Sequence, residues 1–135
     1  MYRILVPLNG GIDRAKRQAS YVATLPCADS EIEAVLAHTM DKEERSVDED
    51  MQQADRIDTV RRAKETLSDA GVSTKTQTLS SPPKDGIISL AESESIDEIV
   101  MGGRKRSPTG KAVFGSTAQH VMLNSPSPVT FVREQ

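Results

Sequence analysis

Short apolar runs alternate with amphipathic stretches along the whole chain. Residues 4–6 are apolar at every position and end at Pro7, a pattern typical of a strand buried on both faces of a sheet. Residues 12–25 then carry apolar side chains at helical spacing, and Pro26 ends that helix. The same patterns predict further strands at 32–39, 72–79, 96–101 and 129–132, and further helices from residue 46, from residue 81 and at 115–124.

Turn and capping residues mark several of these boundaries. Residues 46–49 form a capping box that opens a long helix, and Gly71 is suited to end it in the left-handed conformation. Pro126 and Pro128 flank the last strand, which places that strand at an edge of the sheet. Strands that alternate with helices predict an α/β fold, an open parallel five-stranded sheet with helices on both faces.

Composition narrows the class of protein. The 135 residues suit a single domain, residues 1–135, and aromatic residues make up only 3% of them. That scarcity and a net charge of −3 disfavour a nucleic-acid binder. Cys27 is the only cysteine and is expected to be a small buried apolar residue, so no intrachain disulfide is predicted. With no run long enough to cross a membrane and no cluster with metal-ligand spacing, we expect a soluble, cytoplasmic protein without a metal site.

Charge is unevenly distributed, and this directs attention to one loop. Residues 1–100 carry a net charge of −7, whereas residues 101–135 carry +4. The loop after the fourth strand holds Arg104, Lys105, Arg106 and Lys111 among several glycines, and it leads into Ser116 at a predicted helix N-terminus. Ligands of open α/β sheets bind at such strand ends, and helix N-termini favour anions. By contrast, Arg14, Lys16 and Arg17 on the first helix are expected to form a solvated face.

Two phosphate-binding motifs do not fit this loop. A Walker loop requires a hydroxyl residue after its lysine, but Ala112 follows Lys111. The dinucleotide fingerprint requires a third glycine after Gly10 and Gly11, and that glycine is missing.

The sequence resembles the universal stress protein family along essentially its full length. The resemblance rests on residues 3–10 (Arg-Ile-Leu-Val-Pro-Leu-Asn-Gly), 35–38, 128–132 and the late loop. Gly102 and Gly115-Ser116 stand at the spacing of the glycine motif in ATP-binding members, but Lys105 replaces its middle glycine and Asn9 replaces the usual aspartate. The family implies a Rossmann-like sheet, similar to adenine nucleotide α-hydrolases, with strand order 3-2-1-4-5.

The resemblance also implies a binding site for ATP or another adenine nucleotide, with Mg²⁺ as a candidate companion. Its nucleoside part would use Pro7, Leu8, Asn9, Thr39, Met101, Gly102 and Gly103. Its phosphates would use Lys105, Gly115, Ser116 and Thr117, and charge alone adds Arg104, Arg106 and Lys111 to this set. Lys105 would either contact a phosphate or crowd it with its Cβ. A homodimer through the strand from Val129 to Val132 is implied as well.

Three functions remain open at this point. The first is a regulatory, non-enzymatic stress-response module that binds an adenine nucleotide. The second is a dimeric interaction module that binds no nucleotide and uses the cationic loop for a protein partner or another anion. The third is a nucleotide hydrolase, which is disfavoured because the loop offers no general base, although slow hydrolysis would be compatible with bound ATP and Mg²⁺.

Overall fold

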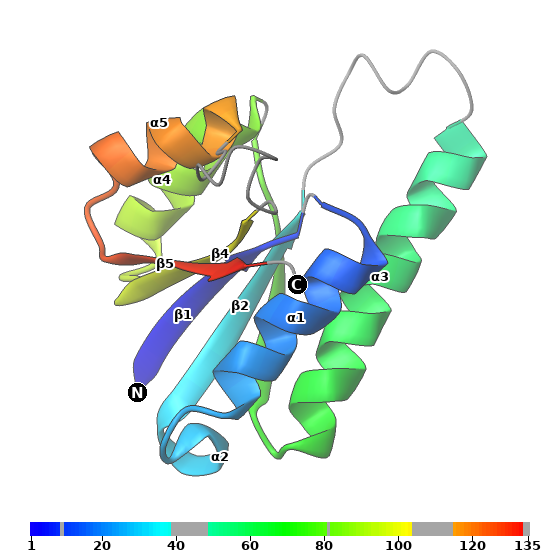
Figure 1. Ribbon diagram of the computed structural model, residues 1–135, viewed down its shortest axis with the longest axis vertical. Helices are drawn as coiled ribbons and strands as arrows, with labels where there is room; N and C mark the ends of the chain where they lie inside the picture. The colour runs from blue at the N-terminus through cyan, green and yellow to red at the C-terminus, as the bar shows by residue number, and fades with distance from the viewer. Residues whose placement is uncertain (9, 39–48, 81, 104–114, 134–135) are drawn as a thin grey trace, which may run out of the picture.

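Strands and helices alternate in the computed structural model, which describes residues 1–8, 10–38, 49–80, 82–103 and 115–133, with only the backbone for residues 49–57 (Figure 1). The elements are β1 (Tyr2–Pro7), α1 (Ile12–Ala23), α2 (Ala28–Glu31), β2 (Ile32–His38), α3 (Glu49–Asp69), β3 (Ser73–Thr78), α4 (Pro83–Ser93), β4 (Glu98–Gly103), α5 (Ser116–Asn124) and β5 (Val129–Arg133).

The five strands form one parallel sheet in the order β3-β2-β1-β4-β5, which confirms the expected fold. Helices α1 and α3 cover one face of the sheet, and α4 and α5 cover the other (Figure 1). The strand order reverses between β1 and β4, because β2 and β3 lie to one side of β1 while β5 lies beyond β4. The Pro-flanked strand β5 lies at an edge, as the sequence predicted.

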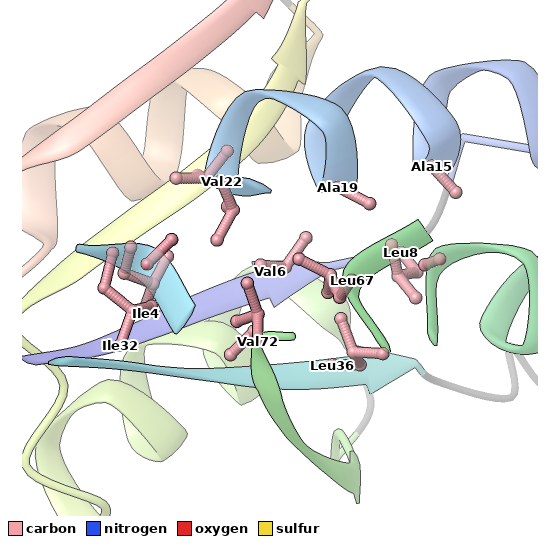
Figure 2. Packing of buried hydrophobic residues seen from close by; sticks show 14 residues of the cluster. Ile4, Val6, Leu8, Ala15, Ala19, Val22, Ile32, Leu36, Leu67 and Val72 are labelled. Atoms are coloured by element: carbon pink, nitrogen blue, oxygen red, sulfur yellow. The ribbon is translucent and has the colours of Figure 1, made fainter. Parts of the chain in front are cut away.

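Each face of the sheet has its own apolar core. Val6 of β1 and Leu8, just after this strand, point toward Ala15 and Ala19 of α1 (Figure 2), and Leu67 of α3 belongs to the same cluster. Successive strand residues point to opposite faces, so the intervening side chains of β1, β2 and β4 enter a second core beneath α4 and α5. The continuous apolar runs of these strands reflect burial on both faces.

Three local features differ from the sequence-based expectation. The short helix α2 was not predicted, and Cys27, which precedes it with a φ of 58°, is exposed rather than buried. Strand β4 runs from residue 98 to 103 instead of 96 to 101. Ile96 is buried, but its N–H donates to the carbonyl of Ala91 at the end of α4, so its apolar character marks the helix end and not the strand.

Two further expectations concern helix ends and the membrane. Gly71 has a φ of 79°, which confirms the left-handed end of α3, and the next N–H, that of Val72, donates to the carbonyl of Leu67. The capping box at residues 46–49 lies mostly outside the described residues. None of the helices that the structure describes is both long and apolar enough to span a membrane.

Candidate functional site

Strands β1 and β4 pair over only a short length, next to the point where the strand order reverses. Their register pairs Ile4 with Glu98 and Leu5 with Ile99, and no later pair follows in the described residues. Beyond that point Gln18 of α1 bridges the two strands, because its Nε2 donates to the carbonyl oxygens of Pro7 (2.8 Å) and Val100 (3.0 Å). The ends of β1 and β4 are therefore joined through a side-chain amide rather than through backbone hydrogen bonds. Ligands of open α/β sheets bind at such a place, where the strand order reverses.

Gln18 was not singled out in the sequence, although it is only 1% exposed. It stands on the face of α1 that also carries the core residues Ala15, Ala19 and Val22. Its two donated bonds fix which amide atom is the nitrogen, and no donor among the described residues reaches its Oε1. A polar residue inside an apolar helical stripe is the one sequence signal that could have indicated this bridge.

The structure brings part of the predicted site together at the carboxyl edge of the sheet. Pro7 and Leu8 end the β1 region, Met101, Gly102 and Gly103 end β4, and Gly115, Ser116 and Thr117 begin α5. The side chains of Leu8 and Met101 are buried in the two opposite cores, at 5% and 4% exposure. Asn9, Thr39, Arg104 and Lys105 lie outside the described residues.

Helix α5 begins without a side-chain cap. Gly115 is its N-cap residue, no acid stands in the first turn, and the first intrahelical bond runs from the N–H of Gln119 to the carbonyl of Gly115 (3.0 Å). The preceding backbone N–H groups lack an intrahelical partner by geometry and carry the positive end of the helix dipole. Such a helix start favours an anion.

Gly115 itself is not required by the backbone or by described neighbours. Its φ of −69° is accessible to any residue, and no atom lies within 4 Å of a Cβ built at this position. The space beside its Cα is therefore open toward the described part of the chain.

Arg14 occupies the same edge from the first turn of α1. A Cβ built on Gly102 would lie well under 3.0 Å from Cγ and Cδ of Arg14, and one built on Gly10 would lie equally close to its Cδ, Nη1 and Nε. The half-buried Arg14 side chain thus lies directly on the bare backbone of two glycines from two different strand ends. The prediction that Arg14 belongs to a solvated face is wrong for this residue.

A groove of about 560 Å³ lies between α1 and the end of β5. Lys16, Arg17 and Tyr21 line it from α1, and Val132 and Arg133 line it from β5. It contains none of the predicted site residues. Among the described residues no group of three or more His, Cys, Asp or Glu side chains could hold a metal ion.

Comparison with known proteins places this architecture in a family. The sequence profile described as "Universal stress protein family" matches residues 1–133. A universal stress protein from Archaeoglobus fulgidus is similar in structure, with 29% identity, 98% coverage of each chain and a TM-score of 0.80. A universal stress protein from the same organism, solved in complex with dAMP, has 23% identity, 98% coverage of each chain and a TM-score of 0.74.

A plant relative extends the comparison. A universal stress protein family protein from Arabidopsis thaliana with AMP bound shares 16% identity over 100% of this chain and 93% of that one, with a TM-score of 0.70. Comparison with curated protein sequences gave no match.

Proposed function

Because the chain belongs to the universal stress protein family, we propose that it binds ATP or another adenine nucleotide at the carboxyl edge of its sheet. The ligand would lie between the ends of β1 and β4, with its phosphates at the start of α5. The dAMP and AMP complexes of the similar proteins support the ligand class.

The observation that carries the proposal is the start of α5. An uncapped helix N-terminus, a first turn without acids and an open Gly115 occur together beside the strand ends. A phosphate there would accept hydrogen bonds from the first N–H groups of the helix and from the hydroxyls of Ser116 and Thr117. The nucleoside would contact the backbone at Pro7, Leu8, Met101, Gly102 and Gly103, since the side chains of Leu8 and Met101 are buried in the cores.

The roles of Asn9, Thr39, Arg104 and Lys105 belong to the same proposal. They are carried over from the family resemblance and from charge, and Mg²⁺ would accompany ATP through its phosphates. We propose a cytoplasmic, regulatory and non-catalytic stress-response role. An assay for phosphate release from Mg-ATP checks the last point, and release faster than from Mg-ATP in buffer alone would contradict the non-catalytic role.

Thermal unfolding with and without Mg-ATP or AMP tests nucleotide binding. At a ligand concentration 100-fold above Kd, the folded state gains about 2.7 kcal/mol. No rise in the unfolding temperature at millimolar nucleotide would overturn the proposal.

An acidic residue introduced at the start of α5 tests whether the phosphates bind there. Ser116 is exposed at the first position of α5, so Ser116→Asp adds an acid that suits the helix dipole but repels a phosphate. We expect at least a tenfold loss of ATP affinity without loss of stability. Gln119→Glu, at an exposed position one turn later, is the matched control and should change affinity less than threefold.

We also propose that the protein forms a homodimer through β5. This strand lies at an edge of the sheet, and its residues from Val129 to Val132 are only part-buried. Pairing with the same strand of a second copy would cover them. Light scattering across a concentration series should give twice the monomer mass, and a mass of one chain at all concentrations would contradict it.

A dimeric interaction module without nucleotide is the second candidate. The observation that favours it is that Arg14 already covers Gly102, where the nucleoside would lie. Acid extraction of the purified protein discriminates the two functions, because a released compound with adenine absorbance supports the first candidate. Its absence, together with no thermal shift, supports the second.

A further inference from the structure

We infer that Arg14 determines the specificity of this site, making it select phosphorylated adenine nucleotides over adenosine. The inference rests on the proposed function and deepens it. It assigns a role to a residue that the sequence pattern places on a solvated helix face.

The first step is the position of the side chain. Arg14 reaches from α1 across the strand ends, with its aliphatic stem over Gly102 and its Cδ and guanidinium atoms over Gly10. The three atoms nearest to a Cβ at either glycine all belong to Arg14. Neither glycine has a positive φ, so the close approach of this side chain is what requires the missing Cβ atoms.

The second step is what this position means for a ligand. Gly102 is where the sugar of a bound nucleotide would pack, so a ligand that reaches it must displace the Arg14 stem. Adenosine would lose that contact and gain no ionic contact in return. A phosphorylated ligand would offer two oxygens to the displaced, planar guanidinium, which would form a strong, bidentate, charge-assisted contact.

The third step is the contrast with the next cations on the same helix. Lys16 and Arg17 line the groove beside Tyr21 and Val132, and neither is among the atoms nearest to Gly10 or Gly102. Arg17 is half-buried like Arg14 and has the same charge. The overall positive charge of α1 is therefore equal in Arg14→Ala and Arg17→Ala, and only position distinguishes the two variants.

The experiment measures Kd for AMP and for adenosine by calorimetry. In Arg14→Ala we expect weaker AMP binding and tighter adenosine binding. The Kd for adenosine divided by the Kd for AMP should therefore fall at least tenfold from its wild-type value. Arg14→Met keeps an aliphatic stem without the charge, and should weaken AMP binding without improving adenosine binding. Arg17→Ala should leave the ratio unchanged, and circular dichroism checks that each variant is folded.

A ligand-free measurement tests the covering contact separately. Gly102→Ala should lower the unfolding temperature by several degrees in the wild type, because its Cβ collides with Arg14, and by clearly less in the Arg14→Ala background. Equal losses in both backgrounds would overturn the inference.

The remaining outcomes separate the two proposals. Binding of both ligands with an unchanged ratio in Arg14→Ala would overturn the role of Arg14 and leave the proposed function in place. Binding of neither ligand to any variant would overturn both.

Discussion

The two edges of the sheet differ in whether their polar groups have side-chain partners within the chain. At the amino edge, Arg3 Nε donates to Glu33 (3.0 Å), its Nη2 to the Glu94 carboxylate (3.3 Å), and its Nη1 to the Glu94 backbone carbonyl. Tyr2 donates its hydroxyl to Glu98 (2.8 Å), and Asp97 accepts from the Arg3 N–H (2.8 Å). At the carboxyl edge, α1 and α5 both begin without a side-chain cap.

This difference indicates which edge the fold leaves available for a ligand. At the amino edge, charged side chains are paired within the chain, with partners in β2, just after α4, and at or just before the start of β4. The carboxyl edge holds uncapped helix starts and glycines, and Gln18 bridges β1 and β4 there, beyond their last backbone pair in the described residues. The largest effect on this contrast should come from removing that bridge.

Gln18→Leu keeps the side-chain volume but leaves the carbonyls of Pro7 and Val100 buried without their donor. We expect a loss of about 2–4 kcal/mol in the free energy of unfolding, and weaker AMP binding as the strand ends shift. Chemical denaturation measures the first effect and calorimetry the second. Gln77→Leu is the control, because its amide only reaches Glu94 at 3.5 Å and should cost below about 0.5 kcal/mol.

Arg3→Met removes the hydrogen bonds of the Arg3 guanidinium at the amino edge instead. The Arg3 side chain is 23% exposed and serves several partners, so its loss should cost about 1–3 kcal/mol of stability. AMP affinity should remain within twofold of wild type, because the change lies at the opposite edge from the proposed site. A loss of affinity as large as that in Gln18→Leu would show that the two edges are not independent.

Gly11→Ala tests the backbone at the start of α1. Gly11 has φ 90° and ψ 176°, a conformation nearly restricted to glycine, and there is open space around a built Cβ. The cost should therefore be conformational alone, about 1–2 kcal/mol by denaturation. Gly115→Ala, at an ordinary φ, should change stability by less than about 0.5 kcal/mol, and equal costs would contradict this account.

The smallest effect concerns alkaline pH at the amino edge. The hydrogen bond to Glu98, followed by burial and nearby acids, raises the pKa of Tyr2 from 10.0 to about 12. Its contribution to stability is present below pH 10 and is lost as pH rises toward 12, because the unfolded chain releases the proton first. Tyr2 is 42% exposed, so the effect should stay below about 1 kcal/mol. In Tyr2→Phe, the free energy of unfolding should fall less between pH 10 and 12 than it does in the wild type.

Most elements followed from local pattern, and the exceptions have physical reasons. The apolar runs of β1 and β2 predicted buried strands because every side chain of a doubly covered strand meets a core. The start of β4 was predicted two residues too early, because an apolar residue such as Ile96 is expected both at a buried helix end and in a buried strand. At the site, the family resemblance pointed to the glycines and to the start of α5, whereas Gln18 was not singled out.

The amino-acid pattern was enough to predict the order of the elements, the left-handed end at Gly71 and the edge position of β5, because these depend on residue conformation and hydrophobic period. The contacts that α1 makes with the strand ends could not be predicted in this way and became visible in the fold. Helical spacing puts Arg14 and Gln18 one turn apart on one side of that helix. Their contacts with Gly102 and Val100, however, join segments more than 80 residues apart in the sequence, so no local pattern reveals them. Gly102, to which the family resemblance gave a role in ligand binding, is covered by the side chain of Arg14.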